Sequence, residues 1–228
     1  MEGGAMSLTT HLMEQRTDEW YAARCGLLTA SSIGSLLTPT LKVANNETSR
    51  GVTASVLAER ITGFVDPTWQ NADMSRGVLE EPRAVETYAR HFNREVTTAG
   101  LLVRDDWGFS IGYSPDGLVG DDGLVEVKSP RQKGHLQTIL DDQVPTYHMA
   151  QLQTGLLVSG RQWIDFVSFC GGMPIWVKRV EPDEEWQAAI LAAAANFEDN
   201  AAKSLAAYQA TTAGMPVPER FYEMEMVI

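Results

Sequence analysis

The 228-residue sequence predicts an α/β fold in which a mixed central β-sheet is flanked by helices. Helical patterns dominate the first 95 residues, short strand-like runs fill 96–128, and two further strands lie between later helices. A hairpin signal lies at the centre, where Gly120–Gly123 reads as a turn between two apolar runs. No repeat or linker interrupts this order. We therefore predict a single domain over 1–228, with a flexible start at 1–8 and a loose tail at 219–228.

Composition and charge exclude several classes of protein. Hydrophobic residues make up 44% and charged residues 21% of the chain, which is typical of a globular domain. No apolar run is long enough to span a membrane and no signal-peptide pattern opens the chain, so we expect a soluble, cytoplasmic protein. The net charge of −12 argues against a general nucleic-acid coat protein, but it allows an enzyme whose basic residues gather in one channel.

Cysteine and histidine usage gives no sign of a structural metal site. Cys25 and Cys170 lie far apart in the sequence, so we interpret both as buried, reduced thiols. Two cysteines cannot supply the four thiolates of an iron–sulfur cluster, and the four histidines show no zinc-binding spacing.

Residues 14–39 predict two short helices with a possible anion site between them. The first helix begins near residue 17 and ends at Gly26, and the second begins at Thr29 and continues to Pro39. Free N–H groups and hydroxyls at the start of the second helix, including that of Ser31, would suit a phosphate if Arg24 lies nearby. The alternative is ordinary helix capping with a surface arginine.

The next segment predicts two longer helices. The elements expected here are a loop at 38–50, a helix at 52–61, a connection at 64–71 and, within 74–93, a helix whose periodicity starts at Val78. Pro82 is placed near the start of the last helix, where its missing N–H is tolerated. Glu81 is then predicted to lie close to a helix N-terminus, and the simplest alternative is a solvated carboxylate.

The stretch Tyr113–Pro130 is the most informative part of the chain. Strands predicted at 96–103 and 109–113 lead into it, and 118–119 pairs with 124–128 across the turn. Side chains alternate along a strand, so Glu126 and Lys128 share one face. The hairpin returns Asp116 beside them, which brings two carboxylates and one ammonium group together.

This set of side chains suits metal-dependent phosphodiester hydrolysis. Carboxylate oxygens bind a hard cation such as Mg²⁺, which keeps several waters for a substrate phosphate. A neighbouring lysine can polarise the attacking water or offset charge that develops on the phosphorus. A solvated surface hairpin explains Glu126 and Lys128 alone, but it explains less well why Asp116 lies across the turn.

The rest of the chain adds polar candidates. The segment from Arg131 to His135 reads as a basic loop, in which Arg131 and Lys133 either grip phosphate or face solvent. Tyr147 and Gln151 share a face of the next helix because they are four residues apart, and a half-buried tyrosine beside a surface glutamine is the alternative. Strands at 162–170 and 175–180 follow, joined by a turn at 171–174. A final helix from 182 is predicted to bury Trp186, Ile190, Leu191, Phe197, Leu205 and Tyr208.

Five sequence blocks together resemble the phage lambda exonuclease family, the YqaJ-like viral recombinase branch of the PD-(D/E)xK nucleases. The blocks are WYAARCGLLTAS (20–31), GVLEEPRAVETY (77–88), SPDGL (114–118), EVKSP (126–130) and YHMAQLQ (147–153). The resemblance extends from about Trp20 to about Phe169, which is most of the chain. A single block would be weak evidence, whereas five in the family's order, each with its polar residue present, are specific.

The resemblance implies roles for the candidate residues. The implied catalytic residues are Asp116, Glu126, Lys128, Glu81 and Gln151. The implied metal ligands are Asp116, Glu126, the Val127 carbonyl and Glu81, which spacing favours over its neighbour Glu80. The residues implied to hold the 5′-phosphate or the DNA are Arg24, Ser31, Ser114, Tyr147, Arg131 and Lys133. The family's basic residue after the Glu-x-Lys strand does not align cleanly here, so Arg131 and Lys133 both remain candidates.

The resemblance also implies an activity and its partners. The expected protein is a Mg²⁺-dependent exonuclease that binds two cations per active site, with Mn²⁺ as a substitute. It would act on double-stranded DNA ends, degrade one strand 5′ to 3′ to mononucleotides, and leave 3′ single-stranded tails for annealing. A homotrimeric ring, a single-strand annealing protein as partner, and a phage or prophage origin in a bacterial host are implied as well. Two alternatives stay open, namely a repair or restriction endonuclease on the same core and a non-catalytic DNA-end scaffold.

Overall fold

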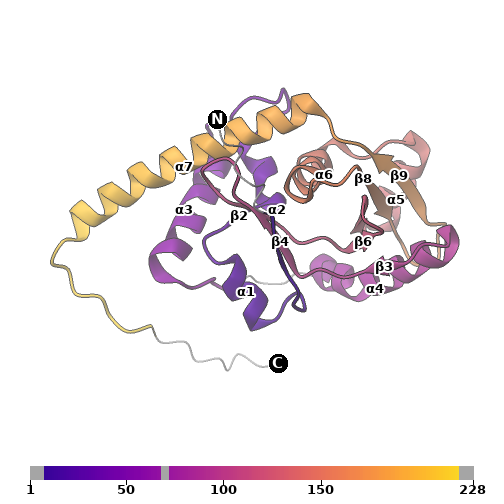
Figure 1. Ribbon diagram of the computed structural model, residues 1–228, viewed down its shortest axis with the longest axis horizontal. Coiled ribbons are helices and arrows are strands. Elements are labelled where there is room, and N and C mark those ends of the chain that lie inside the picture. Colours follow the sequence, from indigo (N-terminus) through magenta and orange to yellow (C-terminus); the bar gives the residue numbers. More distant parts are fainter. Residues whose placement is uncertain (1–7, 68–71, 221–228) are drawn as a thin grey trace.

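The computed structural model describes residues 8–67 and 72–220, and it contains two β-sheets packed among helices (Figure 1). The strands are β1 Leu8–His11, β2 Leu28–Thr29, β3 Val96–Thr97, β4 Leu101–Arg104, β5 Ile111–Tyr113, β6 Gly117–Val119, β7 Gly123–Lys128, β8 Trp163–Ser168 and β9 Trp176–Val180. The helices are α1 Asp18–Arg24, α2 Ala30–Ile33, the 3₁₀ turn η1 Gly34–Leu36, α3 Glu47–Thr62, α4 Ala72–Phe92, α5 Gln132–Asp141, α6 Thr146–Ser159 and α7 Glu184–Thr212. The predicted α/β class is confirmed, although the strands divide between two sheets.

The five-stranded sheet is mixed and carries helices on both faces. Its strand order is β3-β6-β7-β8-β9, with β7 and β8 parallel and the other pairs antiparallel. Because side chains alternate along β7, Val125 and Val127 face α4, where they pack in one buried cluster with Tyr88. Glu126 faces the opposite side, where Gln151 of α6 contacts it. The central strand β7 therefore presents two valines to α4 and, on its other face, the core residue Leu124 followed by Glu126 and Lys128.

The four-stranded sheet has the order β1-β4-β5-β2, and it corrects two predictions. The single strand predicted at 96–103 is wrong, because β3 belongs to one sheet and β4 to the other. Gly100 lies between them, where an added Cβ would be 2.4 Å from the carbonyl oxygen of Met13. Strand β1 was not predicted, since its residues are mostly exposed and show no alternation.

Three helix boundaries differ from those predicted. The second helix was predicted to reach Pro39, but α2 ends at Ile33 and η1 at Leu36. Helix α3 starts at Glu47, inside the predicted loop 38–50, because Asn46 forms a capping box with Ser49. Pro82 lies inside α4 instead of near its start. It lies on the exposed side of that helix, where water can replace the lost hydrogen bond.

Helix α7 runs along one side of the molecule, and its C-terminal part extends past the neighbouring helices (Figure 1). Its buried residues end at Ala201, so the predicted burial of Tyr208, which is 43% exposed, is wrong.

Both cysteines are free as predicted; Cys170 is buried but Cys25 is only half-buried. Among the described residues, no helix is long and apolar enough to cross a membrane. The predicted flexible start and loose tail lie largely in 1–7 and 221–228, which are outside the described residues. Part of the predicted connection at 64–71 also lies outside them, at 68–71.

Candidate active site

The turn between β5 and β6 brings Asp116 to the end of β7. The backbone N–H of Val127 donates to Asp116 Oδ2 at 2.7 Å, which fixes the carboxylate against the strand that carries Glu126. Gly117 follows Asp116, and an added Cβ there would lie 2.4 Å from a methyl group of Val96. The hairpin predicted from the sequence is confirmed, and it closes tightly enough to place Asp116 beside β7.

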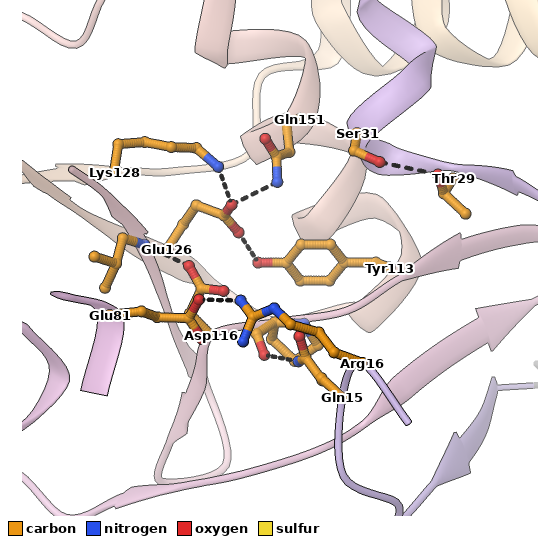
Figure 2. A network of polar contacts seen from close by, with 12 residues as sticks. Gln15, Arg16, Thr29, Ser31, Glu81, Tyr113, Asp116, Glu126, Lys128 and Gln151 are labelled. Carbon is orange, nitrogen blue, oxygen red and sulfur yellow. Dashed lines mark hydrogen bonds and ion pairs between the residues drawn. The ribbon is translucent and has the colours of Figure 1, made fainter. Parts of the chain in front are cut away.

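Glu126 is the most enclosed carboxylate of the site, with 2% of its surface exposed. Its Oε1 accepts hydrogen bonds from Lys128 Nζ at 2.7 Å and from Gln151 Nε2 at 2.5 Å (Figure 2). Its Oε2 accepts from the hydroxyl of Tyr113 at 2.9 Å. Three donors from β5, β7 and α6 therefore hold one carboxylate in place.

Crowding of negative charge dominates the electrostatics here. Burial and the nearby Glu126 raise the pKa of Asp116 well above its usual value, although Lys128 opposes this shift. Burial alone would lower the pKa of Lys128, but Glu126 and Asp116 outweigh it and raise that pKa. Burial, followed by the charges of Glu126 and Asp116, also raises the pKa of the Tyr113 hydroxyl well above its usual value. The buried cluster is short of positive charge.

Glu81 reaches the site from the middle of α4. The prediction that it lies near a helix N-terminus is wrong, because α4 begins at Ala72 and continues through Pro82. Its carboxylate pairs with Arg16 and adds to the negative charge felt by Asp116 (Figure 2). The adjacent Glu80 lies instead near Arg76, with Oε2 3.7 Å from Arg76 Nε, and it is not among the charges that shift the pKa of Asp116. Glu81 is thus the glutamate that the fold brings to the other carboxylates.

The donor atoms suit a hard divalent cation. Asp116, Glu126 and Glu81 offer only oxygens, and a cation would relieve the repulsion that raises the pKa of Asp116. Within residues 8–67 and 72–220, no three acidic, histidine or cysteine side chains form a ready-made metal cluster. Glu81 is occupied by Arg16 and Glu126 by its three donors, so a cation would have to compete with these partners.

A second polar group lies at the C-terminal end of α1. The guanidinium of Arg24 donates to Ser114 Oγ at 3.3 Å and to Thr29 Oγ1 at 3.4 Å, and it lies 4.2 Å from the Trp20 ring centroid. Thr29 also contacts Ser31 Oγ at 3.1 Å. The structure thus brings Arg24, Ser31 and Ser114 together, as the sequence predicted.

Arg24 combines burial with hydrogen-bond partners that carry no charge. Burial lowers the pKa of its guanidinium, an effect that nearby Glu59 opposes. Within the described part of the chain its hydrogen bonds go to neutral hydroxyls, and it forms no ion pair. A largely buried cation lined by hydroxyls and an aromatic ring is a favourable site for an anion.

The predicted basic loop at 131–135 is wrong. Helix α5 begins at Gln132, and His135 anchors it, with Nδ1 2.7 Å from Ser168 Oγ and Nε2 2.9 Å from the Pro174 carbonyl. Arg131 precedes this helix and pairs with Asp73 at 2.7 Å, and Lys133 is exposed. Neither basic residue contacts the carboxylate cluster in this structure.

Of the two candidate residues on α6, only Gln151 contacts the carboxylate cluster in the described structure. Gln151 donates to Glu126, whereas Tyr147 is 77% exposed and packs its ring 4.2 Å from that of His148. Sequence reasoning missed Tyr113 and Arg16. The sequence indicates only that Tyr113 ends a strand, and not that its hydroxyl reaches Glu126. No sequence pattern predicts the contact between Arg16 and Glu81, which lie 65 positions apart.

The fold and site define a class of protein. A mixed sheet flanked by helices carries Asp116 at the start of a hairpin and Glu126 and Lys128 on its return strand, which is the arrangement of the PD-(D/E)xK nuclease core. The family model of the YqaJ-like viral recombinase domain matches residues 19–162. Because the match covers more than half of the chain, the protein belongs to this family, which confirms the resemblance seen in the sequence.

Solved structures support the same assignment. The alkaline exonuclease LHK-Exo from Laribacter hongkongensis is 33% identical, with a TM-score of 0.73, and 86% of this chain matches 100% of that one. A structure of LHK-Exo in complex with dAMP gives 32% identity, a TM-score of 0.77, and coverage of 88% and 100%. A phage-related exonuclease from Haemophilus somnus 129PT, at 15% identity, a TM-score of 0.55 and coverage of 78% and 96%, shares the fold. No curated protein matches the chain.

Proposed function

We propose that the protein is a Mg²⁺-dependent exonuclease that degrades one strand of linear double-stranded DNA from its 5′ end. Family membership supports a nuclease acting on DNA. The observation that carries the finer proposal is Arg24, a largely buried cation whose hydrogen-bond partners are hydroxyls and which lies next to Ser114, two residues before Asp116. A 5′-phosphate held there would sit close to the carboxylate cluster.

The chain's own residues would act on the scissile phosphate in distinct ways. Lys128, held against Glu126 and with its ammonium charge secured by a raised pKa, would offset the charge that develops on the phosphorus. Gln151 and Tyr113 keep Glu126 oriented. Mg²⁺ held by Asp116, Glu126, Glu81 and the Val127 carbonyl, as two cations or with Mn²⁺ in their place, would supply Lewis-acid stabilisation and activate the attacking water.

The 5′-phosphate pocket would determine the direction of digestion. Arg24, Ser31 and Ser114 would bind the terminal phosphate and so place the first internucleotide bond at the cluster. Each cut would then leave a new 5′-phosphate for the next round. Release of mononucleotides is consistent with the dAMP held by the similar enzyme LHK-Exo. The product would be duplex DNA with 3′ single-stranded tails.

The biological setting proposed is phage-type recombination. A YqaJ-like viral recombinase would pass its 3′ tails to a single-strand annealing protein. We also propose that it encircles DNA as a homotrimer in the cytoplasm of a bacterial host. In that ring Tyr147, Arg131 and Lys133, which are all exposed, would be available to contact the DNA backbone.

Digestion of linear and closed circular duplex DNA of the same sequence tests the activity. Incubation with Mg²⁺ should convert the linear form to 5′-mononucleotides and leave the closed circle intact, while Lys128→Ala should release none. Nicking or linearisation of the circle would instead indicate an endonuclease on the same core. No cleavage with Mg²⁺ or Mn²⁺, together with retained binding to DNA ends, would indicate a scaffold.

A further inference from the structure

An arginine that the active-site motifs do not include reaches the carboxylate cluster. Arg16 lies between β1 and α1, and its Nη2 donates to Glu81 Oε2 (Figure 2). This ion pair joins the segment before α1 to the middle of α4. The cluster of three carboxylates is therefore faced by two cations in this structure, Lys128 and Arg16.

The backbone that carries Arg16 is held firmly on both sides. Gln15 Nε2 donates to the carbonyls of Pro115 at 2.8 Å and Ala99 at 3.3 Å, so it binds the same turn that presents Asp116. Thr17 Oγ1 donates to the Glu14 carbonyl at 2.8 Å and caps α1. The position of Arg16 relative to Asp116 is thus set by hydrogen bonds that do not involve its own side chain.

Arg16 also has an unfavourable backbone conformation. Its φ is +69°, in the left-handed region that favours glycine. Such a conformation at a non-glycine residue persists only where surrounding contacts impose it, and it is found most often at functional sites. Here those contacts come from Gln15 and Thr17, and the result is that a long cationic side chain points at Glu81.

The side chain itself is less constrained than its backbone. It is 38% exposed, and in the described structure its one ion pair is with Glu81. Glu81 is also a proposed ligand of the divalent cation, and one carboxylate oxygen cannot serve both partners fully. A cation that binds Glu81 would therefore release a guanidinium at the edge of the cluster, where a DNA phosphate is proposed to lie.

We propose that Arg16 changes partner during the reaction cycle. Without a divalent cation it neutralises Glu81, and when the cation binds Glu81 the guanidinium turns to a phosphate oxygen of the DNA strand. The planar fork of arginine matches phosphate in two hydrogen bonds, which a lysine cannot do. This inference rests on the proposed divalent-cation site, and it adds a substrate-binding residue that also competes with the cation.

Substitutions at Arg16 separate this exchange from a purely structural ion pair. Arg16→Gly removes the guanidinium and suits the positive φ, so the fold should be retained. Arg16→Lys keeps a charge that can compete for Glu81 but lacks the fork. Arg90→Ala is the matched control, since Arg90 forms an exposed ion pair with Glu86 on α4.

The experiment measures two binding reactions in the absence of turnover. Mn²⁺ binding is followed by electron paramagnetic resonance, and binding of 5′-phosphorylated duplex DNA is measured with Ca²⁺ in place of Mg²⁺. Arg16→Gly should bind Mn²⁺ about 10-fold more tightly and DNA about 10-fold more weakly, the scale of one charge-assisted contact. Arg16→Lys should leave Mn²⁺ binding near that of the unsubstituted protein and weaken DNA binding. Arg90→Ala should change neither.

Two results would overturn the inference. Mn²⁺ binding that is unchanged or weaker in Arg16→Gly would mean that Arg16 does not compete for Glu81, and unchanged DNA binding would mean that it does not move to the substrate. The melting temperature of each variant shows whether folding is intact. If the unsubstituted protein fails to bind Mn²⁺, the proposed cation site itself is wrong, which is a separate outcome from a failure at Arg16.

Discussion

Two buried carboxylate clusters lie on opposite faces of the five-stranded sheet, and they are neutralised very differently. On the α4 face, Asp165 of β8 accepts two hydrogen bonds from Arg179, at 2.8 and 2.9 Å, and one at 2.7 Å from the Tyr88 hydroxyl. Arg179 also lies 3.6 Å from the centroid of the Trp163 ring. There, the charge of one carboxylate is balanced by one guanidinium, and a neutral hydroxyl donates a further hydrogen bond.

At the candidate site, where Glu126 faces α6, Asp116 and Glu126 share a single lysine. Glu81 of α4 adds further negative charge there although it pairs with Arg16, so three carboxylates are matched by two cations. The consequence is visible in the pKa of Asp116, which burial and Glu126 raise. The Asp165 cluster satisfies its charges within the protein, whereas the Asp116 cluster has a deficit of positive charge that the proposed cation and DNA phosphate would fill. Incomplete neutralisation is what distinguishes the candidate active site from a structural ion pair.

The largest expected effect comes from Asp116→Asn. Because burial and Glu126 raise the pKa of Asp116 in the folded state, its contribution to stability is greatest at low pH and is lost as the pH rises through that pKa. The neutral amide should therefore raise the melting temperature at pH 7 by about 2–4 °C, while DNA hydrolysis falls about 10³-fold or more. Calorimetry and nucleotide release measure the two effects. A variant that is both less stable and active would contradict this account of the cluster.

Asp165→Asn should show the opposite pattern. Removing this charge leaves Arg179 without its partner and weakens the acceptor of the Tyr88 hydroxyl, so we expect a loss of about 3 kcal/mol in the free energy of unfolding. Hydrolysis per folded molecule should be unchanged, because Asp165 is bonded to Arg179 and Tyr88, neither of which belongs to the candidate site. Urea unfolding, together with rate measurements at a temperature where the variant is fully folded, separates stability from activity. A large loss of rate in fully folded Asp165→Asn would contradict the claim that Asp165 serves stability alone.

His148 gives a smaller, pH-dependent effect on the α6 face. Burial, and then the nearby Lys128, lowers its pKa from 6.5 to about 3, so the folded protein holds it neutral. A group with a lowered folded pKa stabilises above its unfolded pKa, and the protein loses that stability as the pH falls from 6.5 toward 3. At pH 5 the loss should be about 2 kcal/mol.

His148→Phe keeps an aromatic ring against Tyr147 and Phe166 but cannot be protonated. The free energy of unfolding, measured by urea titration at pH 7 and pH 5, should fall less between these pH values in the variant than in the unsubstituted protein. Equal losses in both proteins would mean that His148 is protonated in the folded state at pH 5, and that Lys128 has less influence on this face than its charge suggests.

The sequence predicts the candidate site better than it predicts the elements that support it. Turn-forming residues and the period of two were enough to bring Asp116, Glu126 and Lys128 together. Local signals failed where a tertiary contact decides the structure. Examples are helix α5, which a buried histidine anchors despite Pro130 and Gly134, and Pro82, which α4 accommodates on its exposed side.

The residues that complete the site were partly beyond sequence reasoning. Gln151 was found through its helical spacing and its family block, and the structure places it against Glu126. Arg16 and Tyr113 were not found, because each contact depends on how distant segments pack. The pairing of Arg131 with Asp73 has the same cause, since the basic residue looked available for phosphate until the fold supplied a nearer acid.

The measurement that tests the central claim most directly is the preference for a 5′-phosphate at the DNA end. Initial rates of nucleotide release are compared on linear duplexes with 5′-phosphate and 5′-hydroxyl ends, for the unsubstituted protein and for Arg24→Gln. We predict a clear preference for the phosphorylated end in the unsubstituted protein, about 10-fold or more, and its loss in Arg24→Gln through a slower rate on that end alone. Equal rates on both ends in the unsubstituted protein, or a preference that survives in Arg24→Gln, would contradict the assignment of this pocket and with it the 5′-to-3′ direction.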